Sequence, residues 1–176
     1  QEAGCLGILQ VSSAEIYGDS LQLVSNGEER DSKINEEEPV RPHSTYGVAK
    51  AAVDYYCQSA WKERQTPVIA LRQFNCIGER ETHPYVVPEI ISQIHAELAL
   101  GKSMWPRKVK LGNNSYRDFQ YAGDAVRMAT ELLEKGQFGE VYNMGSESGI
   151  KIYDLAVKIG SLMGCEVEVE VDESRK

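Results

Sequence analysis

The sequence predicts an α/β fold in which a parallel β-sheet is flanked by helices. Short apolar runs at residues 6–12, 67–74 and 141–144 are typical of strands buried on both faces. Segments with apolar residues at helical spacing separate these runs, and such an alternation of strands and helices favours a parallel sheet. The 176 residues contain no internal repeat and no linker between independent domains, which indicates a single domain.

The first strand leads into a small, polar segment at residues 13–18 and then into a Glu-rich surface loop at 19–42. Ser44 is suited to capping the next helix, which extends to about residue 64. The remaining predicted elements are helices at 86–100, 124–135 (capped by Asp124) and 152–163, and strands at 109–111, 116–121 and 166–171.

The composition excludes several classes of function. With a net charge of -8 and scattered basic residues, the chain lacks the clustered Lys and Arg of a nucleic-acid-binding protein. No apolar run approaches the roughly 20 residues that span a bilayer, and the first residues lack the basic region of a signal peptide. The cysteines are widely spaced in apolar patterns (Cys5, Cys57, Cys76 and Cys165). We therefore expect a reduced cytoplasmic protein with buried free thiols and no metal site.

The pair Tyr46 and Lys50 points to chemistry, because a spacing of four residues places both side chains on one face of a helix. A nearby ammonium group favours the phenolate form of a tyrosine. Such a tyrosine can take a proton from a hydroxyl group while a hydride leaves the same carbon atom. Alone, the pair is equally compatible with a surface contact, because a chain with nine tyrosines reaches this spacing readily by chance.

Further motifs accompany this pair in order along the chain. They are SSAEIYG at 12–18, PHST at 42–45, LRQFN at 71–75, RDF at 117–119 and GD at 123–124. In an open α/β sheet, ligands bind beyond the C-terminal ends of the strands. Several of the motifs fall at such strand ends.

Together these motifs resemble those of the nucleotide-sugar epimerases and 4,6-dehydratases, in the extended branch of the short-chain dehydrogenase/reductase superfamily. The resemblance covers nearly the whole chain. It implies the C-terminal part of a Rossmann-like doubly wound parallel sheet, mostly residues 1–80 and 121–148. It also implies part of a smaller substrate-binding subdomain, mostly residues 81–120 and 149–176.

The resemblance implies roles for individual residues. Tyr46 matches the base that oxidises the sugar at C4, and Lys50 matches the residue that activates this base and holds the nicotinamide ribose. Ser12 joins these two in the cofactor-binding set, and Ser13 matches the hydroxyl that binds the C4 oxygen. Glu15 matches the residue that removes the C5 proton in 4,6-dehydratases, with a solvated loop carboxylate as the alternative.

Position 14 departs from the pattern of the dTDP-glucose dehydratases, which carry an Asp there that protonates the departing C6 hydroxyl. With Ala14 in this place, Glu15 would serve both steps. 4-Epimerases usually carry a non-acidic residue where Glu15 stands, so Glu15 favours a dehydratase. Sugar-acid decarboxylases of the family also retain a Glu.

Three residues are assigned to binding of the nucleotide-diphosphate sugar by the same resemblance. They are Asn75, Arg117 and Leu111. A strand-end turn is the alternative role for Asn75, and an ion pair with Asp118 is the alternative for Arg117.

The family's Gly-rich turn, GxxGxxG, has no match among the fifteen glycines. That turn precedes a helix whose N-terminus holds the pyrophosphate of the dinucleotide. We therefore expect an incomplete domain, weak or absent binding of NAD or NADP by this chain alone, and an exposed sheet edge that invites association. In the family the helix at 44–64 belongs to a dimer interface, a role that suits Tyr56 and Trp61.

Three functions remain open at this stage. The chain is part of an NAD(P)-dependent nucleotide-sugar 4,6-dehydratase, part of a 4-epimerase, or a catalytically inactive fragment that serves only as an interaction module. These residues do not select the sugar, the nucleotide, or NAD over NADP.

Overall fold

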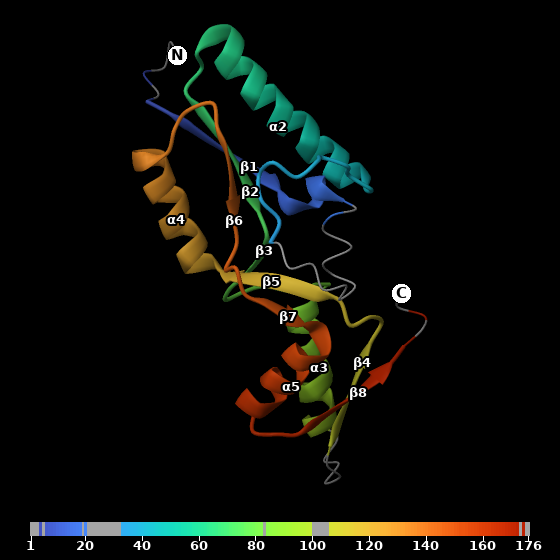
Figure 1. Cartoon of the computed structure of the whole chain (residues 1–176). Helices are drawn as coiled ribbons and strands as arrows, with labels where there is room; N and C mark the ends of the chain where they lie inside the picture. Colours follow the sequence, from blue (N-terminus) through green and yellow to red (C-terminus); the bar gives the residue numbers. More distant parts are fainter. Residues whose placement is uncertain are drawn as a thin grey trace. The chain divides into compact units, whose positions relative to one another are not determined.

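The computed structural model of the chain describes residues 4, 6–18, 20, 33–82, 84–99, 106–172 and 174. The chain forms two compact units (Figure 1). The first consists of Gln1–Cys76 and Asp118–Ser148, and the second of Ile77–Arg117 and Gly149–Lys176. Cys5 and most of the expected loop at 19–42 lie outside the described residues.

The first unit is built on a parallel three-stranded sheet with the strand order β1-β2-β6. These strands are Ile8–Ser13, Val68–Gln73 and Val141–Met144. Ile8 is opposite Val68, and Ala70 is opposite Val141. Helix α2 (Thr45–Arg64) and helix α4 (Ala122–Lys135) cover opposite faces of this sheet (Figure 1). The predicted α/β fold with a parallel sheet is therefore confirmed.

The central strand β2 carries the core of the first unit, because alternate side chains of a strand point to opposite faces. Val68 and Ala70 pack with Cys57 of α2. On the other face, Leu71 packs with Ala125 of α4. Every residue from Val68 to Arg72 is buried, as a strand between two layers of helix requires.

A buried ion pair joins α2 to the central strand. Arg72 donates from Nε to Asp54 Oδ2 at 2.9 Å and from Nη2 to Asp54 Oδ1 at 3.2 Å. The two side chains are only 3% and 1% exposed. Burial opposes the charge on Arg72, but its hydrogen bonds to Asp54 and Tyr17 outweigh that effect and raise its pKa.

The same guanidinium holds the loop that follows β1. Tyr17 lies in the 3-10 helix η1 (Ala14–Tyr17), and its hydroxyl accepts a hydrogen bond from Arg72 Nη1 at 2.8 Å. That hydroxyl donates in turn to Asn143 Oδ1 at 2.6 Å. Arg72 Nη1 also donates to the Glu36 carbonyl at 2.9 Å. Burial raises the pKa of Tyr17, so the hydroxyl keeps its proton and acts as a donor.

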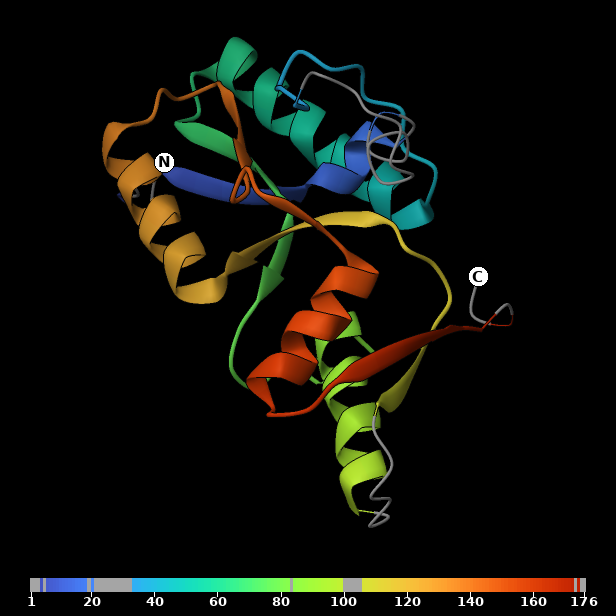
Figure 2. The same ribbon diagram turned by 60° about the horizontal axis from the view of Figure 1, so that its bottom comes forward.

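The second unit contains helices α3 (Val86–Ala99) and α5 (Ile152–Leu162) and a parallel pair of strands, β4 (Arg107–Leu111) and β8 (Val167–Val171). The two helices pack side by side against this pair (Figure 2). Val109 and Leu111 face the helices, whereas Lys108 is exposed and pairs with Glu170. Three further strands are β3 (Asn75–Ile77), β5 (Tyr116–Tyr121) and β7 (Gly149–Lys151).

The structure corrects three details of the sequence interpretation. Helix α4 begins at Ala122, and its N-cap residue is Tyr121 without a side-chain cap bond. Asp124 lies in the first turn and accepts from Arg127 at 2.8 Å, so it is not the cap. The short strands β3 and β7 were not expected, and Cys76 in β3 is exposed rather than buried.

None of the helices in the described part of the chain is long and apolar enough to cross a membrane. Nor do three or more His, Cys, Asp or Glu side chains come together there in a way that could hold a metal ion.

Removing one partner of the buried ion pair should destabilise the first unit strongly. Replacement of Arg72 by Met leaves the carboxylate of Asp54 buried without a counter-charge, and we expect the free energy of unfolding to fall by about 3–5 kcal/mol. The double variant with Asp54→Leu and Arg72→Met should recover most of this loss, because no isolated charge remains. Urea unfolding followed by circular dichroism measures both.

Lys33→Met is the control for this prediction, since Lys33 pairs with Glu147 through side chains that are 71% and 77% exposed. That substitution should change the unfolding midpoint little. A loss in Arg72→Met no larger than in Lys33→Met would contradict the proposed importance of the buried pair.

Candidate active site

The turn after β1 presents one acidic side chain to solvent. Ser13 ends the strand and caps η1, with its Oγ accepting a hydrogen bond from the backbone N of Glu15 at 3.2 Å. Ala14, Ile16 and Tyr17 are buried, whereas Glu15 is exposed. The tight turn packs its apolar side chains into the core of the first unit and leaves the carboxylate of Glu15 at the surface.

The first turns of α2 place Tyr46 and Lys50 on one face. Ser44 caps the helix as predicted, accepting from the backbone N of Gly47 at 2.9 Å. Tyr46 is 54% exposed, so its hydroxyl is available to a ligand. Lys50 Nζ lies 5.7 Å from the centre of the Tyr46 ring.

Lys50 is also fixed to the end of β1. Its Nζ donates to the Val11 carbonyl at 2.8 Å, and its own carbonyl accepts from Ser12 Oγ at 3.3 Å. An ammonium group has three donors, so one bond to Val11 leaves others for a ligand. Ser12 is buried, and its side chain supports the helix at this point.

Gly47 allows α2 to approach the turn that carries Glu15. A Cβ atom at this position would lie 2.9 Å from the Glu15 carbonyl oxygen and 3.0 Å from Cβ of Pro42. Both distances are too short for comfortable van der Waals contact. The absence of a side chain at Gly47 therefore lets the backbone of α2 lie close to the Glu15 carbonyl, a constraint that the YxxxK spacing alone does not reveal.

The structure thus brings five of the predicted residues to one end of the first unit: Ser12, Ser13, Glu15, Tyr46 and Lys50. Asn75 is exposed in β3, within the same unit. Arg117 and Leu111 belong to the second unit. The Leu111 side chain is 5% exposed and part of that unit's core, and Arg117 Nη1 donates to the Tyr116 carbonyl at 2.8 Å.

Asp118, the neighbour of Arg117, stabilises the loop after β6. Its Oδ1 accepts from the backbone N of Ser146 at 2.8 Å, and its Oδ2 accepts from the backbone N of Glu147 at 3.0 Å. Glu147 has a positive φ of 59°, a conformation that such bonds help to hold. The RDF motif could not indicate this partner, because residues 118 and 146 are far apart in sequence.

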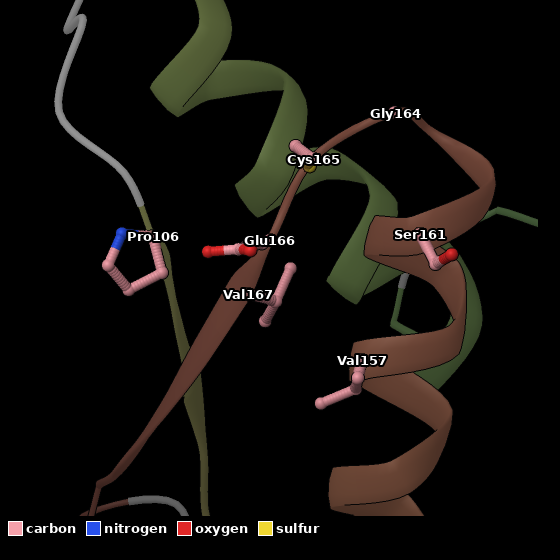
Figure 3. Close-up of a pocket in the computed structure, with 7 residues that line it drawn as sticks. All are labelled: Pro106, Val157, Ser161, Gly164, Cys165, Glu166 and Val167. Carbon is pink, nitrogen blue, oxygen red and sulfur yellow. The ribbon is translucent and has the colours of Figure 1, made fainter.

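A depression in the surface of the second unit contains none of the predicted site residues. It has a volume of about 550 Å³ and is lined by Pro106, Val157, Ser161, Gly164, Cys165, Glu166 and Val167 (Figure 3). Glu166 is its one charged residue. The motifs that point to catalysis all lie elsewhere in the chain, so we do not place the active site there.

Comparisons with known proteins identify the family of the chain. Residues 1–145 match the NAD dependent epimerase/dehydratase family. The chain belongs to this family. It is 30% identical over 164 residues to the dTDP-D-glucose 4,6-dehydratase of Mus musculus, covering 92% of this chain and 41% of the mouse protein.

Solved structures of the family have the same fold over about half of their length. The dTDP-glucose 4,6-dehydratase of Bacillus anthracis, in complex with NAD, is 27% identical with a TM-score of 0.75, covering 94% of this chain and 50% of that one. RMD of Pseudomonas aeruginosa, complexed with NADPH, is 27% identical with a TM-score of 0.78, covering 93% and 52%. Family membership and the Rossmann-like fold are thus confirmed.

Gly47→Ala tests the close approach between α2 and η1. A helical Ala is favoured over Gly by about 1 kcal/mol in the absence of other contacts. Here the added Cβ would press on the Glu15 carbonyl and on Pro42, and overpacking of this kind costs about 1–3 kcal/mol. We therefore expect a net loss of stability in a denaturant melt.

An exposed position of helix α4 supplies the control, because Val126→Ala introduces the same helix former without a new contact. It should leave stability unchanged or slightly raised. Equal behaviour of the two variants would contradict a tight fit at Gly47.

Proposed function

We propose that the chain is the catalytic part of an NAD(P)-dependent nucleotide-sugar 4,6-dehydratase. The observation that carries the proposal is the exposed Glu15 on a turn held against the helix that presents Tyr46 and Lys50. Family membership and the similarity to dTDP-glucose 4,6-dehydratases support it. The substrate class is a nucleoside-diphosphate sugar with hydroxyl groups at C4 and C6.

Each residue has a step that its position favours. Tyr46 takes the proton of the C4 hydroxyl while the C4 hydrogen leaves as a hydride, with Lys50 stabilising the phenolate. Ser13 Oγ accepts a bond from the Glu15 amide, and its own O–H can donate to the C4 oxygen. The resulting 4-keto group acidifies the C5 proton, which Glu15 removes.

Elimination of water follows. Glu15, having taken the C5 proton, gives a proton to the departing C6 hydroxyl, and a C5–C6 double bond forms. Return of the hydride to C6 and addition of a proton from solvent to C5 yield the 4-keto-6-deoxy sugar, and Tyr46 releases to solvent the proton that it took from the C4 hydroxyl. A bound nicotinamide dinucleotide supplies the acceptance and return of the hydride.

The residues at this end of the first unit fit part of a dinucleotide site. Lys50 Nζ has donors beyond its bond to Val11, and Tyr46 is exposed beside it, so both suit contacts with the nicotinamide ribose. The side chain of Ser12 is buried and bonded to the Lys50 carbonyl. In our proposal Ser12 therefore supports Lys50 and does not contact the dinucleotide directly. NAD and NADP both remain candidates.

Turnover of dTDP-glucose with NAD tests the proposal, with the product identified by mass spectrometry and NMR. Because the chain matches only 41% of the mouse relative, it is assayed alone and together with the separately expressed part of that protein that it does not match. Glu15→Gln and Tyr46→Phe should each lower turnover by about 10²–10⁴-fold, the usual contribution of a general base. The matched controls are Glu37→Gln and Tyr85→Phe, both at exposed positions.

The products separate the alternative functions. A sugar with inverted C4 and an intact 6-hydroxyl, formed equally by Glu15→Gln, would identify a 4-epimerase. No turnover in either form of the assay would leave the interaction module as the function of the chain.

We further propose that the protein forms a homodimer through α2. The side of the helix directed away from the sheet exposes Val48, Val53, Tyr55 and Tyr56, with Tyr56 70% exposed. Trp61, which the sequence assigned to the same role, packs within the first unit, where its ring centre lies 6.4 Å from that of Phe138. It is therefore removed from the proposed interface.

An unpaired charge in the centre of this interface should weaken the dimer. Tyr56→Arg should raise the dissociation constant at least about tenfold, as for a buried aromatic anchor. Sedimentation equilibrium measures this constant. Val157→Arg, which alters an equally apolar exposed position of the second unit, should leave it unchanged. A monomeric wild-type chain at all concentrations would contradict the proposal.

A further inference from the structure

Asp54 fixes the orientation of α2, the helix that carries Tyr46 and Lys50, about the helix axis. The three residues follow at intervals of four, so they form one stripe along α2. Asp54, at the buried end of this stripe, accepts two hydrogen bonds from Arg72. Gln58 Nε2, one turn further, donates to Asp54 Oδ1 at 2.8 Å. A rotation of α2 that moved Tyr46 would have to break this fork.

The turn that carries Glu15 is held by the same guanidinium. Tyr17 is two residues after Glu15, is completely buried, and bonds through its hydroxyl to Arg72 Nη1 at 2.8 Å and to Asn143 at 2.6 Å. Arg72 Cζ also lies 5.1 Å from the centre of the Tyr17 ring. One side chain of the central strand thus fixes both groups of proposed catalytic residues.

We propose that Tyr17 and Arg72 are positioning residues, which set the separation between Glu15 and the Tyr46–Lys50 pair. This inference rests on the proposed dehydratase function. Neither residue contacts the substrate in this scheme, because both side chains are buried. They act by bonding η1 and α2 to the same residue of the central strand β2.

Tyr17 and Arg72 matter to catalysis through geometry more than through stability. A general base works only within hydrogen-bond reach of its proton, and a displacement of about 1 Å can lower a rate by about 10²-fold. Gly47 keeps η1 and α2 in direct contact, so a small shift of either element changes the site. A purely structural role predicts instead that activity falls only as far as the folded fraction falls.

Tyr17→Phe is the sharpest variant, because it removes one buried oxygen and retains the ring. Arg72 keeps its bonds to Asp54 and to the Glu36 carbonyl, so the variant should fold. Val68→Ala is the matched control. Val68 lies on β2, the strand of Arg72, and is buried. It packs with Cys57 and Val141, away from the Tyr17 hydroxyl. It should lower stability without affecting the turn.

Amide hydrogen exchange gives the readout that does not depend on activity. In Tyr17→Phe we expect exchange to accelerate roughly fivefold at the amides of Glu15 and Arg41, since one hydrogen bond near them is lost. These amides bond to Ser13 Oγ and to the Ile16 carbonyl. Val68→Ala should leave both rates unchanged. Unchanged rates in Tyr17→Phe would overturn the inference.

Steady-state kinetics, in the assay that shows turnover, give the second readout. Tyr17→Phe should lower kcat by about 10- to 100-fold with KM nearly unchanged, whereas Val68→Ala should keep kcat near the wild-type value. Equal kcat values in the two variants would reduce Tyr17 to a structural role and overturn the inference. Absence of wild-type turnover would instead refute the proposed function, and hydrogen exchange would then decide whether Tyr17 holds the turn.

Discussion

The buried bond between Arg72 and Asp54 is the constraint on which the first unit depends. Two charges that are 3% and 1% exposed are tolerated only when their donors and acceptors are satisfied. The fork from Nε and Nη2 satisfies the carboxylate, and Nη1 is used by Tyr17 and by the Glu36 carbonyl. Because these partners come from different parts of the chain, satisfying one guanidinium requires the helix, the strand and the loops to adopt their native arrangement together.

The location of the site follows from this arrangement. β1 and β2 are parallel, with Ile8 opposite Val68 and Ser13 opposite Gln73, so their C-terminal ends lie next to each other at one edge of the sheet. The turn after β1 therefore lies beside the first turns of α2, where the approach is close because Gly47 has no side chain. Lys50 completes the contact through the Val11 carbonyl. A short polar turn and the first turns of a helix thus form the site.

Periodicity revealed most of the elements, because burial of a strand or a helix face leaves a repeat in the sequence. The capping role of Ser44 was also visible, whereas Asp124 was misassigned because an acidic residue suits both a cap and the first turn of a helix. The partners of Tyr17 could not be predicted. Asn143 is 126 residues away from it in sequence, and such a contact arises only from the strand order.

Burial of position 14 explains why one carboxylate would perform two proton transfers. Ala14 is 4% exposed and packs with Ile16, Tyr17 and Ala51. A carboxylate in this cluster would lose its hydration without a charged partner, which disfavours the ionised form. The turn can therefore offer only Glu15 to a substrate unless it is repacked. In the proposed reaction the proton that Glu15 takes from C5 is then the proton available for the C6 hydroxyl, so both transfers occur on the same side of the sugar.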